Sequence, residues 1–315
     1  MKWHGVFRRN PASVPFSAKA GGSGFMSFAM IMQLIISGVA LGFIYSMVSI
    51  EYTLIFNSTG LLNFSHDKLI MLGAYVFAGQ FVLRTGCGYV AATIATVLSM
   101  FITGILIAKG IFNPLRNMAS PIFAVIGTVI MGRIIKELCR IIWGATAFNI
   151  PGFMKGTFKF GGIVITRANT YIIIVAVLLV VALQLYFNHT KSGKAMRCVQ
   201  QNKTAATLMG INVSQNINIT IGISAVVCSV IGILVISLFS VSLTMTNMIG
   251  IKGFAAGVIG GFGYFPGCIV GGVLIGILEN LSTLVIPSIY KDCVAFVLMI
   301  VFLLVQPKGI LGHKK

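Results

Sequence analysis

The sequence predicts an all-α membrane protein, a polytopic transmembrane helical bundle, and three observations lead to this fold class. Of the 315 residues, 57% are hydrophobic and only 9% are charged, whereas a soluble domain has roughly 25% charged residues. Several apolar stretches reach about 18 residues or more, the length that a membrane-spanning helix needs. The strict alternation of a membrane-spanning strand is absent, so helices remain as the way to pair the backbone in lipid.

The charge balance is strongly basic, with 23 Lys and Arg against 5 Asp and Glu and a net charge of +18. In a soluble protein this excess would favour nucleic acid as a partner. Here the basic residues fall mostly in loops and at chain ends, where they orient the spans and contact anionic lipid headgroups. We therefore expect the lipid bilayer, and no nucleic acid, as a partner. The six cysteines are scattered without a C-x-x-C pair, which predicts neither a metal site nor a disulfide framework.

The apolar runs divide the chain into a basic N-terminal tail (1–25), a transmembrane domain (26–312) and a short basic C-terminal tail (313–315). The N-terminal tail reads as disordered or as an upstream extension, with the natural start at Met26 or Met30. The predicted spans cover about 28–56, 61–83, 89–112, one beginning at 121, 171–187, 217–243 and 293–305. A Gly-rich connection occupies 144–168, and a Gly-dense block occupies 250–281.

The Gly-dense block is expected to form a hairpin or a re-entrant pair of short helices. Basic residues place both the polar segment 188–212 and the C-terminus in the cytoplasm, so an even number of crossings must separate them. Only three apolar blocks are visible there, and the 32-residue Gly-dense block, broken by Pro266-Gly267, can supply the fourth. Broken helices at membrane depth line cavities or are buried in protein. We therefore expect this block near a translocation path and about eight to ten crossings in all.

The polar segment 188–212 carries four basic and no acidic residues between two long apolar runs. Its pattern predicts a short amphipathic helix on the cytoplasmic face, with Ala195, Val199, Ala206 and Leu208 as packing positions. A plain solvated loop that only fixes the topology is the alternative.

Within this segment, Thr190, Gly193, Ala195 and Arg197 are followed by Asn202, Ala205-Ala206 and Gly210-Ile211-Asn212. With this run, residues 190–212 resemble the cytoplasmic coupling loop of the permease subunits of bacterial branched-chain amino acid ABC transporters. That family's pattern reads roughly T-x-x-G-x-A-x-R-A, then N, then A-A-x-x-x-G-I-N, and Cys198 is the departure from it here. The resemblance implies that the loop docks into a groove on a separate ATPase subunit. The matching positions are Gly193, Ala195, Arg197, Asn202, Ala205, Ala206, Gly210 and Ile211.

Two other stretches resemble the same family. Asn63-Phe64-Ser65-His66 is similar to its N-F-A/S-H-G-E motif, with Asp67 and Lys68 in place of Gly and Glu. The Gly-dense block is similar to its A-A-V-I-G-G and G-x-x-E run. The positions that we assign to a translocation path or gate are Asn63, His66, Gly257, Gly260, Gly261 and Glu279.

Purely structural roles are the alternative at these positions. Small residues at four-residue spacing also pack helices tightly against one another. Glu279 could pair with a basic group near a helix end, and His66 could be a buried hydrogen-bonding residue. A charged helix face after Met131 could be interfacial, an intramolecular charge network or a path lining; its members are Arg133, Lys136, Glu137 and Arg140.

The chain has no G-x-x-x-x-G-K-[ST] motif and no G-x-S-x-G elbow, so we expect no enzyme activity and no cofactor in this chain, with ATP bound by partner subunits. The resemblance implies an inner-membrane permease for leucine, isoleucine and valine. Its partners would be a second homologous permease, two ATPase subunits and an extracytoplasmic binding protein. Alternatives are a permease of the same architecture for urea, short amides or another small solute, a stand-alone ion-coupled transporter using His66, Asp67 and Glu279, and a membrane enzyme.

Overall fold

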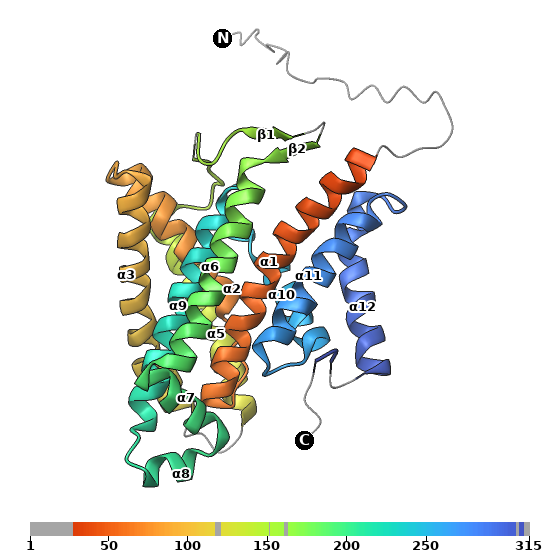
Figure 1. Ribbon diagram of the computed structural model, residues 1–315. Helices are drawn as coiled ribbons and strands as arrows, with labels where there is room; N and C mark the ends of the chain where they lie inside the picture. Colours follow the sequence, from red (N-terminus) through yellow and green to blue (C-terminus); the bar gives the residue numbers. More distant parts are fainter. Residues whose placement is uncertain (1–27, 117–120, 151, 161–162, 307–308, 312–315) are drawn as a thin grey trace, which may run out of the picture.

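The computed structural model describes residues 28–116, 121–150, 152–160, 163–306 and 309–311. The two predicted terminal tails, 1–25 and 313–315, lie outside the described residues. Helices dominate the described chain and run roughly along one axis (Figure 1). The elements are α1 (Phe28–Thr59), α2 (His66–Tyr75), the π-helical η1 (Val76–Arg84), α3 (Tyr89–Ile107), the π-helical η2 (Ala108–Phe112), α4 (Asn113–Arg116), α5 (Pro121–Trp143), β1 (Thr157–Phe160), β2 (Ile163–Thr166), α6 (Arg167–His189), α7 (Lys191–Gln201), α8 (Lys203–Leu208), α9 (Val213–Ile236), α10 (Asn247–Gly260), α11 (Phe265–Ser282), the 3₁₀ turn η3 (Ser288–Tyr290) and α12 (Lys291–Val305).

The helical bundle confirms the predicted fold class, but the predicted number of crossings was too high. Among the described residues, six helices are long and apolar enough to cross a membrane, and α10 is a shorter apolar helix. The expected eight to ten crossings counted the block 61–83 and the helix from 121 as full spans. In the structure the first of these begins with a non-helical stretch before α2, and α5 carries four charged residues.

Helix α1 packs lengthwise against α11 and also contacts α10 and α9, so the first helix is surrounded by helices of the C-terminal half of the chain. At 1.5 Å per residue its 32 residues span about 48 Å, more than the roughly 30 Å hydrocarbon core. The helix accommodates this length by running obliquely (Figure 1). The helix is continuous through Gly38 and Gly42. A Cβ added at Gly42 would lie 2.7 Å from the Cα of Val273, so these glycines let the backbones of α1 and α11 touch.

Among the six candidate spans, helix α9 is the most buried: 78% of its most apolar 18-residue stretch is buried in the bundle, where it packs against α1, α2 and α3. It ends at Ile236, earlier than the predicted 243, because residues 237–246 leave the helix and Val241 pairs with Phe148 through two backbone hydrogen bonds of 3.1 and 2.9 Å. The Gly-rich connection contains a short antiparallel hairpin of β1 and β2, which the sequence did not predict.

The Gly-dense block forms the broken pair that the sequence predicted. The short helix α10 is followed by a turn at 261–264 and then by the full-length α11. Gly261 (φ +108°) and Gly263 (φ +96°) take backbone conformations in this turn that favour glycine. Helices α7 and α8, the α10–α11 turn and the end of α12 lie at one end of the bundle, and the α11–α12 connection lies at the opposite end (Figure 1).

Candidate functional site

Helices α7 and α8 form an angular projection at one end of the bundle, and three polar side chains fix their boundaries. The Thr190 Oγ1 atom accepts a hydrogen bond from the Gly193 N–H at 3.0 Å and caps α7. The Asn202 Oδ1 atom accepts one from the Ala205 N–H at 3.0 Å and caps α8. The Asn212 side chain caps α9 in the same way. Such side-chain caps contribute about 1 kcal/mol each to helix stability. The residues at these three positions therefore determine where the helices of the projection begin.

Two glycines of the projection have different physical roles. Gly193 is buried where α7 turns across the end of α6, and a Cβ there would lie 2.6 Å from the Cα of Phe187. Gly210 has φ +81° in open space, which suits the left-handed residue that ends a helix. Close packing therefore requires the first glycine, and backbone conformation favours the second.

The packing predictions for this segment were right at two positions and wrong at one. Val199 and Ala206 are buried, at 0% and 3% exposure, and Ala195 is half-buried. Leu208, in contrast, is 84% exposed, and the next residue, Met209, is 82% exposed. The end of α8 turns outward, so both side chains lie mostly exposed on the surface of the projection. Ala205 is exposed and Ile211 half-buried.

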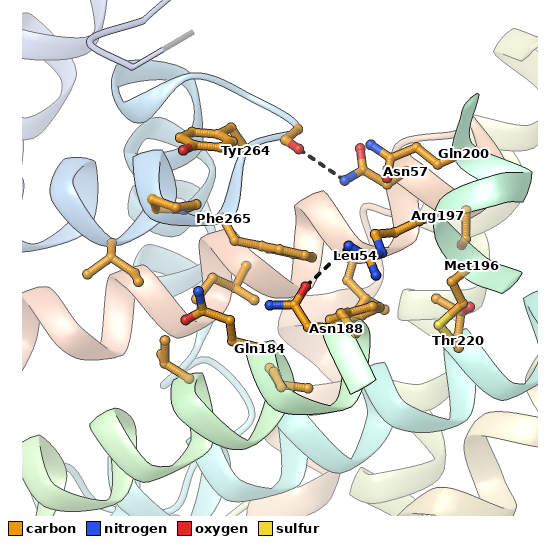
Figure 2. Close-up of a pocket in the computed structure, with 18 residues that line it drawn as sticks. Leu54, Asn57, Gln184, Asn188, Met196, Arg197, Gln200, Thr220, Tyr264 and Phe265 are labelled. Atoms are coloured by element: carbon orange, nitrogen blue, oxygen red, sulfur yellow. Dashed lines mark hydrogen bonds between the residues drawn. The ribbon is translucent and has the colours of Figure 1, made fainter. Parts of the chain in front are cut away.

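Arg197 lines a cavity of about 400 Å³ beneath α7 and is also exposed at the surface of the projection (Figure 2). Its Nη1 atom donates a hydrogen bond to Asn188 Oδ1 at 3.2 Å. Across the cavity, Asn57 Nδ2 donates to the Gly263 carbonyl at 3.1 Å. The cavity thus lies between α1, α6, α7 and the α10–α11 turn. Since Met196, Arg197 and Gln200 of α7 line this cavity, a displacement of α7 would change the shape of the cavity.

A second polar group surrounds the start of α2. Asn63 is 1% exposed, and its Oδ1 accepts hydrogen bonds from the Ser65 N–H at 3.0 Å and Oγ at 2.6 Å. His66, also 1% exposed, contacts the Tyr52 ring in a tilted arrangement with 3.7 Å between ring centroids, and its Nε2 atom has no hydrogen-bond partner among the described residues.

The two departures from the family motif link α2 to α10. The Lys68 ammonium binds Asp67 Oδ2 at 2.7 Å and Asn247 Oδ1 at 2.5 Å. The substituted pair therefore joins the start of α2 to the start of the short helix α10.

The predicted path glycines pack helices together, and none of them lines the 400 Å³ cavity beneath α7. A Cβ at Gly257 would lie 2.8 Å from Ser49 Oγ and 3.1 Å from the Phe262 ring, and a Cβ at Gly260 would overlap the Gly267 backbone. Gly261 supplies the turn between α10 and α11. At these positions the structure favours the tight-packing alternative.

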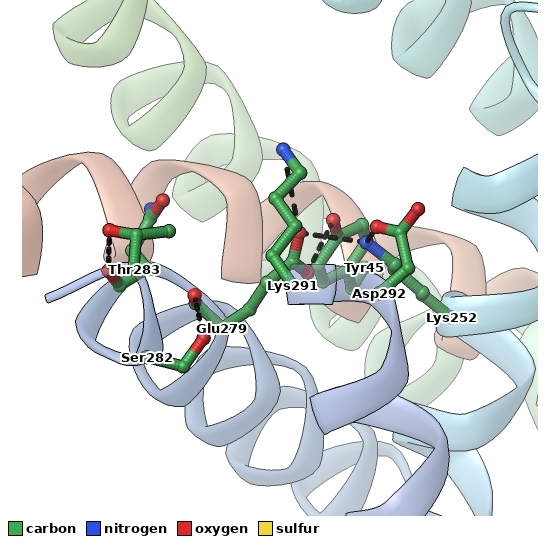
Figure 3. A network of polar contacts seen from close by, with 8 residues as sticks. Tyr45, Lys252, Glu279, Ser282, Thr283, Lys291 and Asp292 are labelled. Atoms are coloured by element: carbon green, nitrogen blue, oxygen red, sulfur yellow. Dashed lines mark hydrogen bonds and ion pairs between the residues drawn. The ribbon is translucent and has the colours of Figure 1, made fainter. Parts of the chain in front are cut away.

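Glu279 belongs to a buried charge cluster, and its partners were not predicted from the sequence (Figure 3). The Lys252 ammonium, 3% exposed, binds Glu279 Oε1 at 2.7 Å and Asp292 Oδ1 at 2.5 Å. The Tyr45 hydroxyl donates to Glu279 Oε2 at 3.0 Å. Lys291 lies 3.8 Å from Glu279. The available signal was Lys252 itself, a lysine inside an apolar helix, where an isolated charge is costly unless it is paired.

The predicted site residues consequently fall in separate places. The α7–α8 set lies together at one end of the bundle. Asn63 and His66 surround the start of α2, the glycines close the α10–α11 hairpin, and Glu279 joins α11 to α10 and α12. On the charged face of α5, the described residues form one ion pair, Glu137–Arg140, at 3.4 Å and more than half exposed. This arrangement does not support an intramolecular network there.

The chain matches one protein family and several individual proteins over most of its length. Residues 34–303 match the family described as "Branched-chain amino acid transport system / permease component". The chain is 30% identical over 299 residues to the high-affinity branched-chain amino acid transport system permease protein LivH of Escherichia coli (strain K12), which covers 91% of this chain and 97% of that protein. It is 30% identical over 297 residues to the corresponding protein BraD of Pseudomonas aeruginosa, covering 90% and 96%.

Sugar permeases are more distant relatives. The fructose import permease protein FrcC of Rhizobium meliloti is 29% identical over 282 residues, covering 82% of this chain and 72% of that protein. No solved structure matches the chain at a significant level.

Proposed function

Because this chain belongs to the family of permease components of branched-chain amino acid transport systems, we propose that it moves leucine, isoleucine and valine across the membrane. It is a multi-pass permease subunit of an ATP-binding-cassette importer. Permeases of this kind work with a separate ATPase and a solute-binding protein. The substrate proposal is supported by relatives that align with nearly the whole chain.

The proposed assembly contains this chain, a second homologous permease, two ATPase subunits and one extracytoplasmic binding protein. ATP would bind to the ATPase subunits, since the sequence lacks a G-x-x-x-x-G-K-[ST] loop that could cradle phosphates. The α7–α8 end, rich in lysine and arginine, would face the cytoplasm because basic residues in short loops resist translocation.

The observation that carries the coupling proposal is the exposed apolar tip of α8. Leu208 and Met209 are more than four-fifths exposed on a projection capped by Thr190, Asn202 and Asn212. Two adjacent apolar side chains on a polar, basic projection outside the apolar spans fit a protein–protein contact. We assign them to the groove of an ATPase subunit.

Movement received at α8 has a direct route into the bundle. Helix α7 is anchored through the Arg197–Asn188 hydrogen bond to the end of α6 and lies over the 400 Å³ cavity. The opposite wall of this cavity is α1, which Asn57 ties to the α10–α11 turn. The cavity gives α7 room to move, and the hydrogen bonds on its two sides connect that movement to the broken hairpin. Arg197 is thus proposed as a positioning residue of the coupling projection.

Paired surface variants test the docking assignment. Leu208→Ser with Met209→Ser removes the apolar tip, and Val285→Ser with Ile289→Ser removes an equally exposed pair, at 86% and 83%, in the α11–α12 connection at the other end. The first variant should lose co-purification with the ATPase subunits, while the second keeps it. Equal retention of ATPase by both variants would refute the docking proposal.

Uptake measurements test the substrate proposal. Proteoliposomes containing the complete transporter should accumulate leucine, isoleucine and valine only with ATP and the binding protein present. Urea or acetamide uptake in place of the amino acids would favour the alternative substrate within the same architecture. Solute transport by the isolated chain, driven by an ion gradient without an ATPase, would contradict the whole assignment.

A further inference from the structure

A second cavity, of about 230 Å³, opens beside the buried charge cluster in the part of the bundle away from α7 and α8. It is formed by α1, the non-helical stretch 237–246, α10, α11 and the start of α12. Pockets for drug-sized ligands measure roughly 300–1,000 Å³. This cavity is smaller, and its size suits a molecule with about as many atoms as a single amino acid.

The cavity wall carries two cations and two anions, Lys252 and Lys291 against Glu279 and Asp292. The balance is neutral, so a ligand with net charge would leave an uncompensated charge in a partly desolvated site. A neutral ligand that bears separated positive and negative groups keeps the balance and can bind to both kinds of residue. The charge pattern therefore selects a zwitterion.

The residues nearest the opening retain unused hydrogen-bonding capacity. Lys291 and Asp292 are 38% and 32% exposed, while Lys252 and Glu279 are almost fully buried. Lys252 uses two of the three N–H donors of its ammonium group on carboxylates. Lys291 lies 3.8 Å from Glu279, beyond hydrogen-bond distance, and its ammonium donates no hydrogen bond among the residues that the structure describes, so its donors can serve a ligand carboxylate. Asp292 gives one oxygen to Lys252 and has acceptor capacity left for a ligand ammonium.

Apart from the side chains of Tyr45 and Thr244, the rest of the wall is apolar. Leu41, Phe239, Met245, Met248 and Ile249 line it, and the partly exposed Met248 and Phe239 stand at the opening. Methionine side chains adapt to differently branched aliphatic groups. A ligand with one zwitterionic end and one aliphatic end would match the charged and the apolar parts of this wall.

We propose that this cavity is a binding site for an amino-acid zwitterion with an aliphatic side chain. The ligand carboxylate binds Lys291, the ligand ammonium binds Asp292, and Lys252 with Glu279 holds those two residues in place. The site would receive the substrate on the side from which a binding protein delivers it. This inference rests on the proposed function, because it names where this chain would contact the transported amino acid.

The purely structural alternative is that the cluster only ties α1, α10, α11 and α12 together. Buried ion pairs are poor stabilisers, and a well-packed apolar cluster performs this task as well or better. A structural tie also needs no cavity beside it and no partly exposed members. Protection by a ligand separates the two roles.

The experiment uses the complete transporter in a background in which the exposed cysteines Cys87, Cys198 and Cys293 are replaced by serine. A reporter is introduced at the cavity opening as Met248→Cys, or as Phe239→Cys if the first variant does not assemble. The control reporter is Val285→Cys, which is 86% exposed and outside the cavity. Maleimide labelling rates are measured with leucine, with isoamylamine, which lacks the carboxylate, and with 4-methylpentanoate, which lacks the ammonium group.

Leucine at about ten times its half-protecting concentration should slow labelling at the cavity reporter about tenfold and leave the control unchanged. The amine and the acid should protect poorly. Lys291→Gln and Asp292→Asn should raise the half-protecting concentration by about tenfold to a hundredfold, and Lys291→Arg should restore most of the protection. A structural tie predicts no ligand protection at all.

Absence of leucine protection at both reporter positions, in a transporter that still takes up leucine, would overturn the inference and leave the proposed function intact. Protection by 4-methylpentanoate as strong as that by leucine would refute the zwitterion site. Failure of the native complex to import leucine would instead refute the proposed substrate.

Discussion

Replacing Lys252 by methionine should strongly destabilise this permease, because the substitution leaves the buried carboxylate of Glu279 and the partly exposed carboxylate of Asp292 without their main counter-charge. Lys252 is 3% exposed and binds Glu279, 1% exposed, at 2.7 Å and Asp292, 32% exposed, at 2.5 Å. The cluster holds two cations and two anions, so the variant keeps one cation against two anions. Breaking a buried pair on one side costs about 3–5 kcal/mol. We expect a loss of this order in the free energy of unfolding.

Adding Glu279→Gln to Lys252→Met should recover most of this loss of unfolding free energy. The double variant Lys252→Met with Glu279→Gln leaves one cation, Lys291, and one anion, Asp292, so the charge balance returns. Both of these side chains are partly exposed to solvent. Glu279→Gln alone should cost less than Lys252→Met alone, because Lys252 keeps Asp292. This asymmetry follows from the position of Lys252 between two carboxylates.

The assay is reversible unfolding of the purified permease in mixed micelles, followed by circular dichroism. Arg140→Met is the matched control, since it breaks the Arg140–Glu137 pair, 3.4 Å long and more than half exposed; exposed pairs contribute about 0–1 kcal/mol. A Lys252→Met loss no larger than that of Arg140→Met would refute the reasoning. So would a double variant that is no more stable than the single one.

Three further predictions concern the helix contacts and the projection. Gly42→Leu should abolish assembly, seen as loss of the monodisperse species in gel filtration, because a Cβ there would lie 2.7 Å from the Val273 Cα, whereas Gly88→Ala, with open space around its Cβ, should behave as the parent. Gly210→Ala should uncouple ATP hydrolysis from uptake, since φ is +81° and the left-handed conformation costs a non-glycine residue about 1–2 kcal/mol; Gly210→Asn should retain more coupling, and equal coupling in both variants would contradict this reason. Asn202→Ala should lower the stability of the α7–α8 bend by about 1 kcal/mol through loss of its cap to the Ala205 N–H and speed limited proteolysis there, an effect that Asn202→Asp should not show.

Family membership confirms the resemblance that the sequence motifs indicated. The motif positions nevertheless have different roles in the structure. Thr190, Asn202 and Gly210 define helix boundaries through local hydrogen bonds and backbone conformation, so their roles can be predicted from neighbouring residues. Arg197 matches the same motif, but its contact with Asn188 and the cavity beneath it depend on how α7 lies over α6.

The sequence by itself determined the class of protein, most of its helices and the break in the Gly-dense block. These features follow from hydropathy and glycine content, which are properties of each segment in isolation. Only the tertiary structure decided that α9 ends at Ile236, where the apolar run continues but the backbone of Val241 pairs with Phe148. It also decided that Leu208 faces outward, although an amphipathic pattern placed it inside.

The partners of Glu279 illustrate the reason. Its hydrogen bonds reach Lys252, 27 residues away, and Tyr45, 234 residues away. Hydropathy marks each of these residues as unusual in an apolar helix but carries no information about which helices lie side by side. That arrangement is set by close backbone contacts such as those of Gly38 and Gly42 with α11, and it brings charges together that the sequence keeps far apart.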